Sequence, residues 1–167
     1  MSKQVVLRPI LLGMNNPISE NPEHALYPHP PNCAGWRLWK MLQVGLGEPV
    51  AAAAYRRVFE RRNLLEGRNW SVKAARAQAP FLLKQLRGRQ VVVLGAQTWD
   101  CLTDSCLRPG PAQIWIKLAE TGLPTTLYYL PHPSGRDRWY NDPQNYDLAA
   151  DLLAKLYCDY TESRVPT

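Results

Sequence analysis

Short apolar runs occur at four places along this chain, and longer segments with helical spacing of apolar residues lie between and after them. The four runs are Gln4–Leu12, Gln90–Leu94, Ile114–Leu118 and Thr125–Leu130. We interpret each as a strand. The second consists of Val and Leu after its first residue, which is typical of a strand buried on both faces, as parallel strands are. Pro9 inside the first run favours a bulge or an edge position there.

Helical periodicity predicts five further elements. They are a helix from Ala34-Gly35 to Gly45–Gly47, a second from Glu48-Pro49 to Arg62, and helices over Val72–Leu86, Gln97–Leu102 and Asn145–Tyr160. Ser71 is expected to cap the third helix, and Pro80 should kink or split it. The alternation of strands and helices predicts an α/β fold, a three-layer α/β/α sandwich around a central, mainly parallel four-stranded sheet. We expect residues 1–167 to form one domain.

Two polar loops follow the first and the last predicted strand. The first, Gly13–Asn32, contains several Asn-Pro and Pro residues that oppose regular structure, and also two His and a Tyr; the second is Pro131–Pro143. Ligands of parallel α/β sheets bind outside the carboxyl ends of the strands. The sequence therefore predicts a site made of these two loops, with Gly95-Ala96-Gln97 as a neighbour or a packing position.

Composition and charge exclude several classes of protein. The chain is 46% hydrophobic and 10% aromatic, so it has enough apolar side chains for a core and is not a disordered tail. Its 20 Lys and Arg against 14 Asp and Glu give a net charge of +6, which fits a polyanionic partner. Arg56-Arg57 with Arg61-Arg62 would form one basic stripe on a helix, and such a stripe is more often a solvated face than a DNA contact.

Membrane, secreted and metal-binding classes are also disfavoured. No apolar run approaches the length of a membrane span, and the N-terminal residues show no signal-peptide pattern, so we expect a cytoplasmic protein. The four Cys form no CxxC pair, which argues against a zinc ribbon or an iron–sulfur cluster and favours buried or idle thiols. All three His (His24, His29 and His132) lie in the two candidate loops, so a three-imidazole zinc site is a minor alternative.

Three segments, in order along the chain, resemble motifs of the uracil-DNA glycosylase superfamily. They are Gly13-Met14-Asn15-Asn16-Pro17, the stretch Val93–Trp99, and Pro131-His132-Pro133-Ser134-Gly135-Arg136. The likeness is nearest to the mismatch-specific uracil/thymine branch, in which a strand ends in Gly-Ile-Asn-Pro-Gly and a late strand ends in Asn-Pro-Ser-Gly. That branch also has Arg-Phe-Trp-Lys on the helix after its first loop, where this chain has Arg37-Leu38-Trp39-Lys40.

The resemblance implies a catalytic pair. Asn15 matches the Asn that positions a water at the sugar carbon, and His132 matches the residue that donates a hydrogen bond to the departing base. Such a donor stabilises the anion that forms on the base as the glycosidic bond breaks, as an oxyanion hole does. A water nucleophile needs no metal and no organic cofactor, so we expect none.

The resemblance also implies how DNA is held. Gly13, Met14 and Asn16 would line the base pocket, and Tyr27, with His29 as a rival, would stack on the extruded base. The remaining candidates belong to the second loop and would enter the duplex or bind phosphates: Ser134, Gly135, Arg136 and Arg138. Trp36 and Trp39 are interpreted as helix-packing residues. Trp139 and Tyr140 beside Arg138 are equally consistent with a nucleic-acid contact and a solvated loop.

The chain departs from the family pattern in its first motif. Pro and the second Gly are displaced by one place, which changes the backbone N–H groups that can reach a base, and no Asp or Glu stands at the catalytic position. We therefore hold three hypotheses. The first is a monomeric glycosylase that removes uracil or a related damaged or modified base flipped out of single- or double-stranded DNA. The others are a non-catalytic base- or DNA-binding protein and a hydrolase of free nucleosides or nucleotides.

Overall fold

The computed structural model describes residues 6–109, 115–118 and 124–165, with 115–118 described by their backbone alone. Its centre is a sheet with strand order β2-β1-β3-β5-β4. The strands are β1 (Ile10–Gly13), β2 (Glu60–Asn63), β3 (Gln90–Leu94), β4 (Trp115–Leu118) and β5 (Thr125–Leu130). The first four in this order run parallel, and β4 pairs antiparallel with β5 at one edge.

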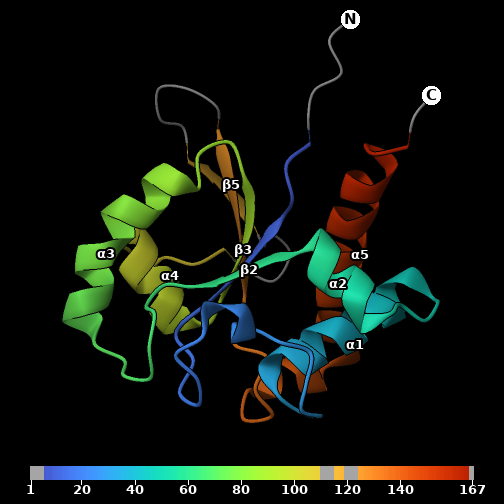
Figure 1. Cartoon of the computed structure of the whole chain (residues 1–167), viewed down its shortest axis with the longest axis horizontal. Coiled ribbons are helices and arrows are strands. Elements are labelled where there is room, and N and C mark those ends of the chain that lie inside the picture. Colours follow the sequence, from blue (N-terminus) through green and yellow to red (C-terminus); the bar gives the residue numbers. More distant parts are fainter. Residues whose placement is uncertain (1–5, 110–114, 119–123, 166–167) are drawn as a thin grey trace, which may run out of the picture.

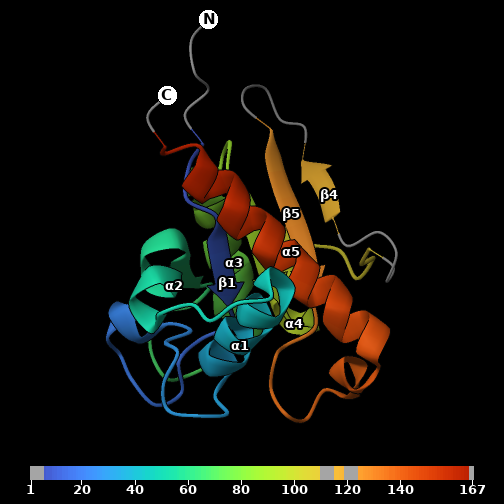
Figure 2. The same cartoon turned by 90° about the vertical axis from the view of Figure 1, so that its right-hand side faces the viewer.

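Helices cover both faces of the sheet, which confirms the predicted three-layer α/β/α fold (Figure 1). One face carries α1 (Ala34–Leu46), α2 (Ala52–Val58) and α5 (Pro143–Glu162). The opposite face carries α3 (Val72–Gln85) and α4 (Ala96–Thr103). Turned by 90°, the molecule shows α5 running across the sheet in front of β1 and β5 (Figure 2). None of these helices is long and apolar enough to cross a membrane.

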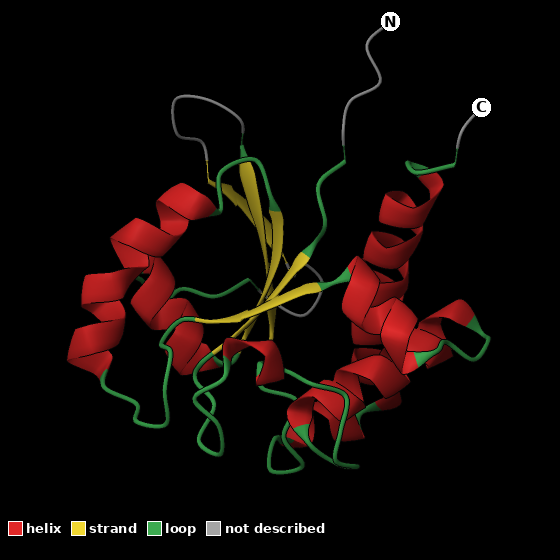
Figure 3. Ribbon diagram, in the orientation of Figure 1, coloured by secondary structure: helices red, strands yellow, loops and turns green. Residues whose placement is uncertain are grey.

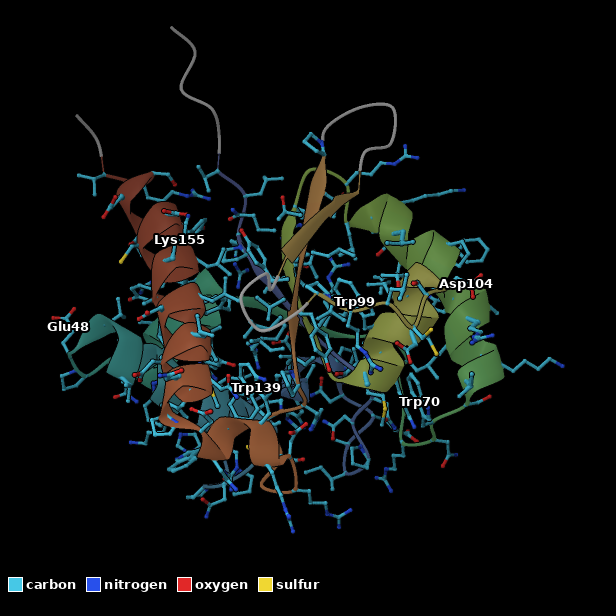
Figure 4. The ribbon with its side chains drawn as sticks, turned by 180° about the vertical axis from the view of Figure 1, so that it is seen from behind. Glu48, Trp70, Trp99, Asp104, Trp139 and Lys155 are labelled. Atoms are coloured by element: carbon cyan, nitrogen blue, oxygen red, sulfur yellow. The ribbon has the colours of Figure 1, made fainter. Side chains whose placement is uncertain are left out.

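The sheet separates two apolar cores because alternate residues of each strand point to opposite faces. Leu11 and Val92 pack toward α1, α2 and α5, whereas Ile10, Leu12 and Val91 pack toward α3 and α4. The largest fully buried side chain is that of Trp99 on α4, which belongs to the second core (Figure 4). Continuous apolar runs thus become strands that are covered on both faces, as the pattern of Gln90–Leu94 predicts.

The second predicted helix is wrong in its second half. The segment predicted to run to Arg62 is helical only over Ala52–Val58, and Glu60–Asn63 forms the edge strand β2 (Figure 3). No apolar run marks this strand, since its sequence is Glu-Arg-Arg-Asn. It forms because its backbone pairs with β1, where Ile10 lies opposite Glu60. The sheet therefore has five strands in the described residues instead of four.

Two of the alternatives expected from prolines are corrected: the edge position at Pro9 and the split of a helix at Pro80. Pro9 lies just before β1, which is an interior strand between β2 and β3, and the Pro9 carbonyl accepts a hydrogen bond from the Glu60 amide at 2.9 Å. The edge position expected from Pro9 is therefore wrong. Pro80 does not split the third helix, which is one element from Val72 to Gln85. Pro80 is exposed, so its ring meets solvent and not the core.

Two short 3₁₀ helices lie within the predicted loops: η1 (Pro22–His24) in the first and η2 (Arg138–Asn141) in the second. Ser71 caps α3 as expected, its hydroxyl accepting a hydrogen bond from the Ala74 amide. Residues 4, 5 and 114, at the beginnings of two predicted strands, lie outside the described residues.

Candidate functional site

The carboxyl ends of the four parallel strands meet at one edge of the sheet, at the bottom of Figure 1. Four connections leave this edge: residues 14–33 after β1, 64–71 after β2, Gly95 into α4, and 131–142 after β5. All the residues predicted for the site lie on the first and the last of these connections or at the end of β1. The fold therefore brings the two candidate loops to the same edge, although they are far apart in the sequence.

Asn15 is half-buried and held by the loop that follows β2. Its Nδ2 donates a hydrogen bond to the Arg68 carbonyl at 2.9 Å. The Asn15 Oδ1 accepts no hydrogen bond from the described residues, so it is available to a water molecule. The fixed amide therefore leaves an acceptor oxygen, the atom that a water-positioning Asn needs.

The neighbours of Asn15 serve the loop itself. Asn16 donates from Nδ2 to the His24 carbonyl at 3.3 Å, and its Oδ1 accepts from the Ile18 amide at 3.2 Å. The Met14 carbonyl accepts from the Leu65 amide at 3.0 Å. At Gly13 an added Cβ would lie 2.6 Å from Asn63 Oδ1. Asn16 thus holds the first loop together, whereas Gly13 and Met14 lie against β2 and its connection.

His132 is half-buried against the end of β3. Gly95 lies next to it with φ +91°, and a Cβ added there would lie 3.2 Å from His132 Cβ. Burial lowers the pKa of His132 below its ordinary value, and the nearby Asp137 carboxylate acts in the opposite direction. The imidazole is therefore neutral near pH 7 and offers one N–H donor. Gly95 is consequently a neighbour of the site, as its place after β3 predicts.

Asn15 and His132 lie at the same edge but do not touch each other within the described structure. The strands that deliver them, β1 and β5, are separated by β3, which corresponds to about 10 Å at the usual spacing of strands. The Asn15 amide turns toward the β2 side, whereas His132 packs on Gly95 beside β3. Two hollows of about 890 and 210 Å³ lie in the described part of the surface, and neither has Asn15 or His132 in its lining.

Tyr27 is held by arginines. Its hydroxyl accepts a hydrogen bond from Arg56 Nη1 at 2.6 Å, and the guanidinium groups of Arg56 and Arg61 lie 5.2 and 5.6 Å from its ring centre. His29 is exposed, and its ring is 5.9 Å from that of Trp39 in a tilted arrangement. Of the two stacking candidates, His29 therefore has the freer ring.

The expectation of one basic stripe is wrong, because Arg56 and Arg57 belong to α2 and Arg61 and Arg62 to β2. Successive residues of a strand point to opposite faces of the sheet. Arg61 accordingly bonds the Glu23 and Ala25 carbonyls on one face, whereas Arg62 bonds Gln85 of α3 on the other.

The second loop forms a tight turn around Ser134 and Gly135. The Ser134 amide donates to the His132 carbonyl at 2.7 Å, and the Asp137 amide donates to the Ser134 carbonyl at 3.2 Å. Gly135 lies close to the Arg37 side chain of α1, since an added Cβ would lie 2.9 Å from Arg37 Nη2. The two cations expected to hold phosphates, Arg136 and Arg138, are both open to solvent.

A hollow of about 210 Å³ lies between α1 and this second loop. It is lined by aromatic, cationic and polar side chains that include Trp36, Arg37, Lys40, Ser134, Tyr140 and Tyr146. Tyr140 donates its hydroxyl to the Pro131 carbonyl at 2.7 Å, so it also supports the loop. Trp139 packs against the core under α5 (Figure 4).

Trp39 of α1 is a packing residue, as the sequence predicts, whereas Trp36 lines the 210 Å³ hollow. Trp39 is half-buried against the first core and donates from Nε1 to the Val50 carbonyl at 2.8 Å. Lys40 lies over both indole rings, 5.4 Å from Trp36 and 5.1 Å from Trp39. This places a cation beside the 210 Å³ hollow.

The described residues contain no group of three or more His, Cys, Asp or Glu side chains arranged to hold a metal ion. His24, one member of the zinc alternative, shares a hydrogen bond of 2.8 Å between its Nδ1 and the Ser19 hydroxyl. The four Cys are free, with Cys101 buried and Cys106 exposed. The Cys33 sulfur accepts from the Trp36 amide at the start of α1, which explains this thiol as a helix cap.

No protein-family model matches the chain, and no curated protein matches it.

Proposed function

We propose that the protein is a DNA glycosylase that hydrolyses the N-glycosidic bond of uracil, or of a related damaged or modified pyrimidine, flipped out of DNA. The observation that carries this proposal is the meeting of the Asn15 loop and the His132 loop at the carboxyl edge of a parallel sheet. The ordered likeness of the three motifs to the uracil-DNA glycosylase superfamily supports it.

The chemistry assigns one task to each side chain. The Asn15 amide nitrogen is fixed by the Arg68 carbonyl, so its oxygen accepts a hydrogen bond from the attacking water and orients that water toward the sugar carbon. The neutral His132 donates its N–H to the oxygen of the leaving base, where negative charge develops. The strands that deliver the two groups are separated by β3, so a base that contacts both groups would have to span the carboxyl end of that strand.

Cations at the same edge support DNA as the substrate. Lys40 on α1 and Arg68 in the β2–α3 connection are exposed there, and Arg136 and Arg138 lie on the second loop. Phosphate contacts of such residues fix a protein on DNA without reading the sequence. The turn at Ser134 and Gly135 is our candidate for the segment that fills the gap left by the base.

The test is a base-excision screen on single- and double-stranded oligonucleotides that carry uracil, thymine opposite guanine, or modified pyrimidines, with alkali cleavage of the abasic product as readout. We expect Asn15→Ala and His132→Ala each to lower the excision rate by roughly 10²-fold or more while DNA affinity stays within a few-fold. Asn69→Ala, an exposed Asn in the β2–α3 connection, is the matched control and should keep the full rate.

His132→Asn distinguishes chemistry from folding. An Asn amide also presents an N–H, so this variant should recover part of the rate that His132→Ala loses. If the protein is folded and binds the oligonucleotides but excises none of the bases, the proposal is overturned.

That outcome would favour the second candidate, a base-binding protein without catalysis. Its specific support is that the Asn15 amide nitrogen already has a protein partner, the Arg68 carbonyl. In that case Asn15→Ala and His132→Ala should change the affinity for base-containing oligonucleotides and nothing else.

A further inference from the structure

A hollow of about 890 Å³ runs along the free edge of β2, on the side away from β1. Nine consecutive residues, 59–67, take part in its lining, so the whole length of the strand is open to it. One wall comes from α2 and the η1 loop, and the other comes from Gln78, Leu82 and Gln85 of α3. The edge strand therefore lies at the floor of a groove.

The backbone of β2 presents unused hydrogen-bonding groups to this groove. The amides of Glu60 and Leu64 donate to the Pro9 and Gly13 carbonyls of the β1 side, each at 2.9 Å. In a parallel ladder, alternate residues direct both N–H and C=O to the same side. Arg61 and Asn63 therefore direct their N–H and C=O groups outward, and these groups have no backbone partner among the described residues.

Arginines stand on both faces of this edge. Arg61 lies on the face of α2 and η1, and Arg62 lies on the face of α3, where it bonds Gln85. Arg8, Arg56 and Arg57 also line the groove near the start of β2, and Arg8 bonds the Arg56 and Phe59 carbonyls. An extended chain beside β2 would thus meet a guanidinium group above it and below it.

Several of these guanidinium groups retain donors. The Nε atoms of Arg8 and Arg61 are buried and have no hydrogen-bond partner in the described structure. Arg57 is exposed on α2 and forms no hydrogen bond or ion pair with the described residues. Glu60, by contrast, is paired: burial raises its pKa, but the hydrogen bonds and charges of Arg89 and Arg62 outweigh this and hold the pKa below its usual value.

We propose that this groove binds an extended, acidic peptide segment of another protein, which adds to the sheet as a sixth strand beside β2. The peptide backbone would pair with the outward N–H and C=O groups of Arg61 and Asn63, as in other cases of strand addition. Its Asp and Glu side chains would meet Arg57 and Arg62 on the two faces. The groove adjoins the first loop, since Asn16 takes part in its lining, but this proposal does not depend on the proposed glycosylase activity.

Two other occupants fit the groove less well. In a second copy of the chain, antiparallel pairing of β2 with β2 would bring either Arg61 or Arg62 opposite its own counterpart, depending on the register, and like charges opposite each other destabilise a sheet. The phosphates of a nucleic acid could pair with the arginines. The outward carbonyls of Arg61 and Asn63 would then have no hydrogen-bond donor and would lie next to negatively charged phosphates.

The experiment measures fluorescence anisotropy of a labelled peptide with the non-repeating sequence Asp-Glu-Val-Asp-Ile-Glu-Asp-Thr against the full chain. Two further peptides carry N-methyl groups on alternate amides, one on the odd set and one on the even set. Strand addition uses only one set, so one methylated peptide should lose binding and the other should keep it. Equal binding, or equal loss, by both methylated peptides would overturn the proposal.

The protein variants test the charges. Arg57→Glu should weaken peptide binding by roughly tenfold or more, because it removes a charge-assisted contact and adds repulsion. Arg76→Glu makes the same charge change at an exposed position of α3 outside the groove and is the matched control. Both positions are exposed, so both variants should fold.

Two further measurements address the other occupants. The first is competition by a single-stranded oligonucleotide. If the oligonucleotide displaces the peptide, and if Arg57→Glu lowers its affinity while Arg76→Glu does not, the groove binds nucleic acid and the proposal is overturned. Sedimentation of the chain alone as a dimer that Arg57→Glu dissociates would assign the groove to a second copy and would also overturn it. A monomer that binds the peptide supports it.

Discussion

At the scale of single residues, the candidate site depends on how neighbours fix two polar side chains. The Arg68 carbonyl determines which end of the Asn15 amide is left for water. Gly95, with no Cβ and φ +91°, lets His132 lie against the end of β3. A side chain at position 95 would be strained and would crowd His132 Cβ at 3.2 Å.

The state of His132 has a consequence for stability. Burial lowers the pKa of His132 in the folded protein below the ordinary value of 6.5. At a pH between these two pKa values, His132 is protonated more often in the unfolded chain than in the folded protein. The stability from the neutral imidazole is therefore complete above about pH 6.5 and falls as the pH drops below it. Urea unfolding near pH 7.5 and 5.5 should show a smaller loss of stability on acidification in His132→Asn than in the wild type.

His24→Asn is the control, because the His24 ring is exposed in the η1 turn. It should keep the pH dependence of the wild type. The same pH dependence in His132→Asn and in the wild type would show that His132 is not held neutral by the fold.

At the scale of elements, α1 and α5 are joined by a close approach of their backbones. Gly45 near the end of α1 lies against the Ala150 carbonyl of α5, and an added Cβ would overlap that carbonyl and crowd Ala154. Gly35, at the start of α1, approaches the carbonyls of Leu26 and Tyr27 in the same way. Glycines at both ends of α1 therefore set its position between the first loop and α5.

Gly45→Ala should destabilise the protein by about 1–3 kcal/mol, because the overlap is with backbone and must be relieved by moving a helix. Ala is a better helix former than Gly, which by itself would stabilise the protein by about 1 kcal/mol. A net loss of stability in Gly45→Ala would therefore come from the close approach of the two helices. Urea unfolding measures it. Val44→Ala, at an exposed neighbouring position of α1, should change stability by no more than about 0.5 kcal/mol. A stabilised Gly45→Ala variant would contradict this packing.

At the scale of the whole molecule, positive charge and strand polarity combine at one edge. The chain carries a net charge of +6, and exposed cations of α1, the β2–α3 connection and the second loop lie where the parallel strands end. A second group of arginines, which lies among glutamates, follows the free edge of β2. The two regions contain different cations, so mutations can test the binding of a ligand to each region separately.

If DNA binds at the carboxyl edge, its affinity should fall as salt rises, because bound cations release counterions from the phosphates. Arg136→Ala and Arg138→Ala should each reduce the slope of log K against log salt concentration by about 0.7–0.9, measured by anisotropy of a labelled oligonucleotide. Arg164→Ala, an exposed cation just beyond the end of α5, should leave the slope unchanged. A flat salt dependence for the wild type would point to free nucleosides or nucleotides as substrates.

The sequence by itself determines most of the elements and the edge at which the loops meet. The apolar run Gln90–Leu94 predicts a buried strand, because a strand covered on both faces needs apolar residues at every position. The helical spacing of apolar residues in Asn145–Tyr160 predicts α5, because a helix that packs on the sheet buries one face. Gly13 and Pro131 mark the ends of two strands in the pattern alone. The shared edge then follows from the parallel order of the strands.

Only the tertiary structure decides the partners of polar groups. The strand Glu60–Asn63 has no apolar period, and it exists because β1 offers unpaired backbone groups that must be satisfied. Likewise, Asn15 faces Arg68 and Tyr27 faces Arg56 through contacts between segments distant in sequence. A hydrogen bond depends on distance and angle between two groups, and no local spacing of residue types encodes the position of a partner that the rest of the fold delivers.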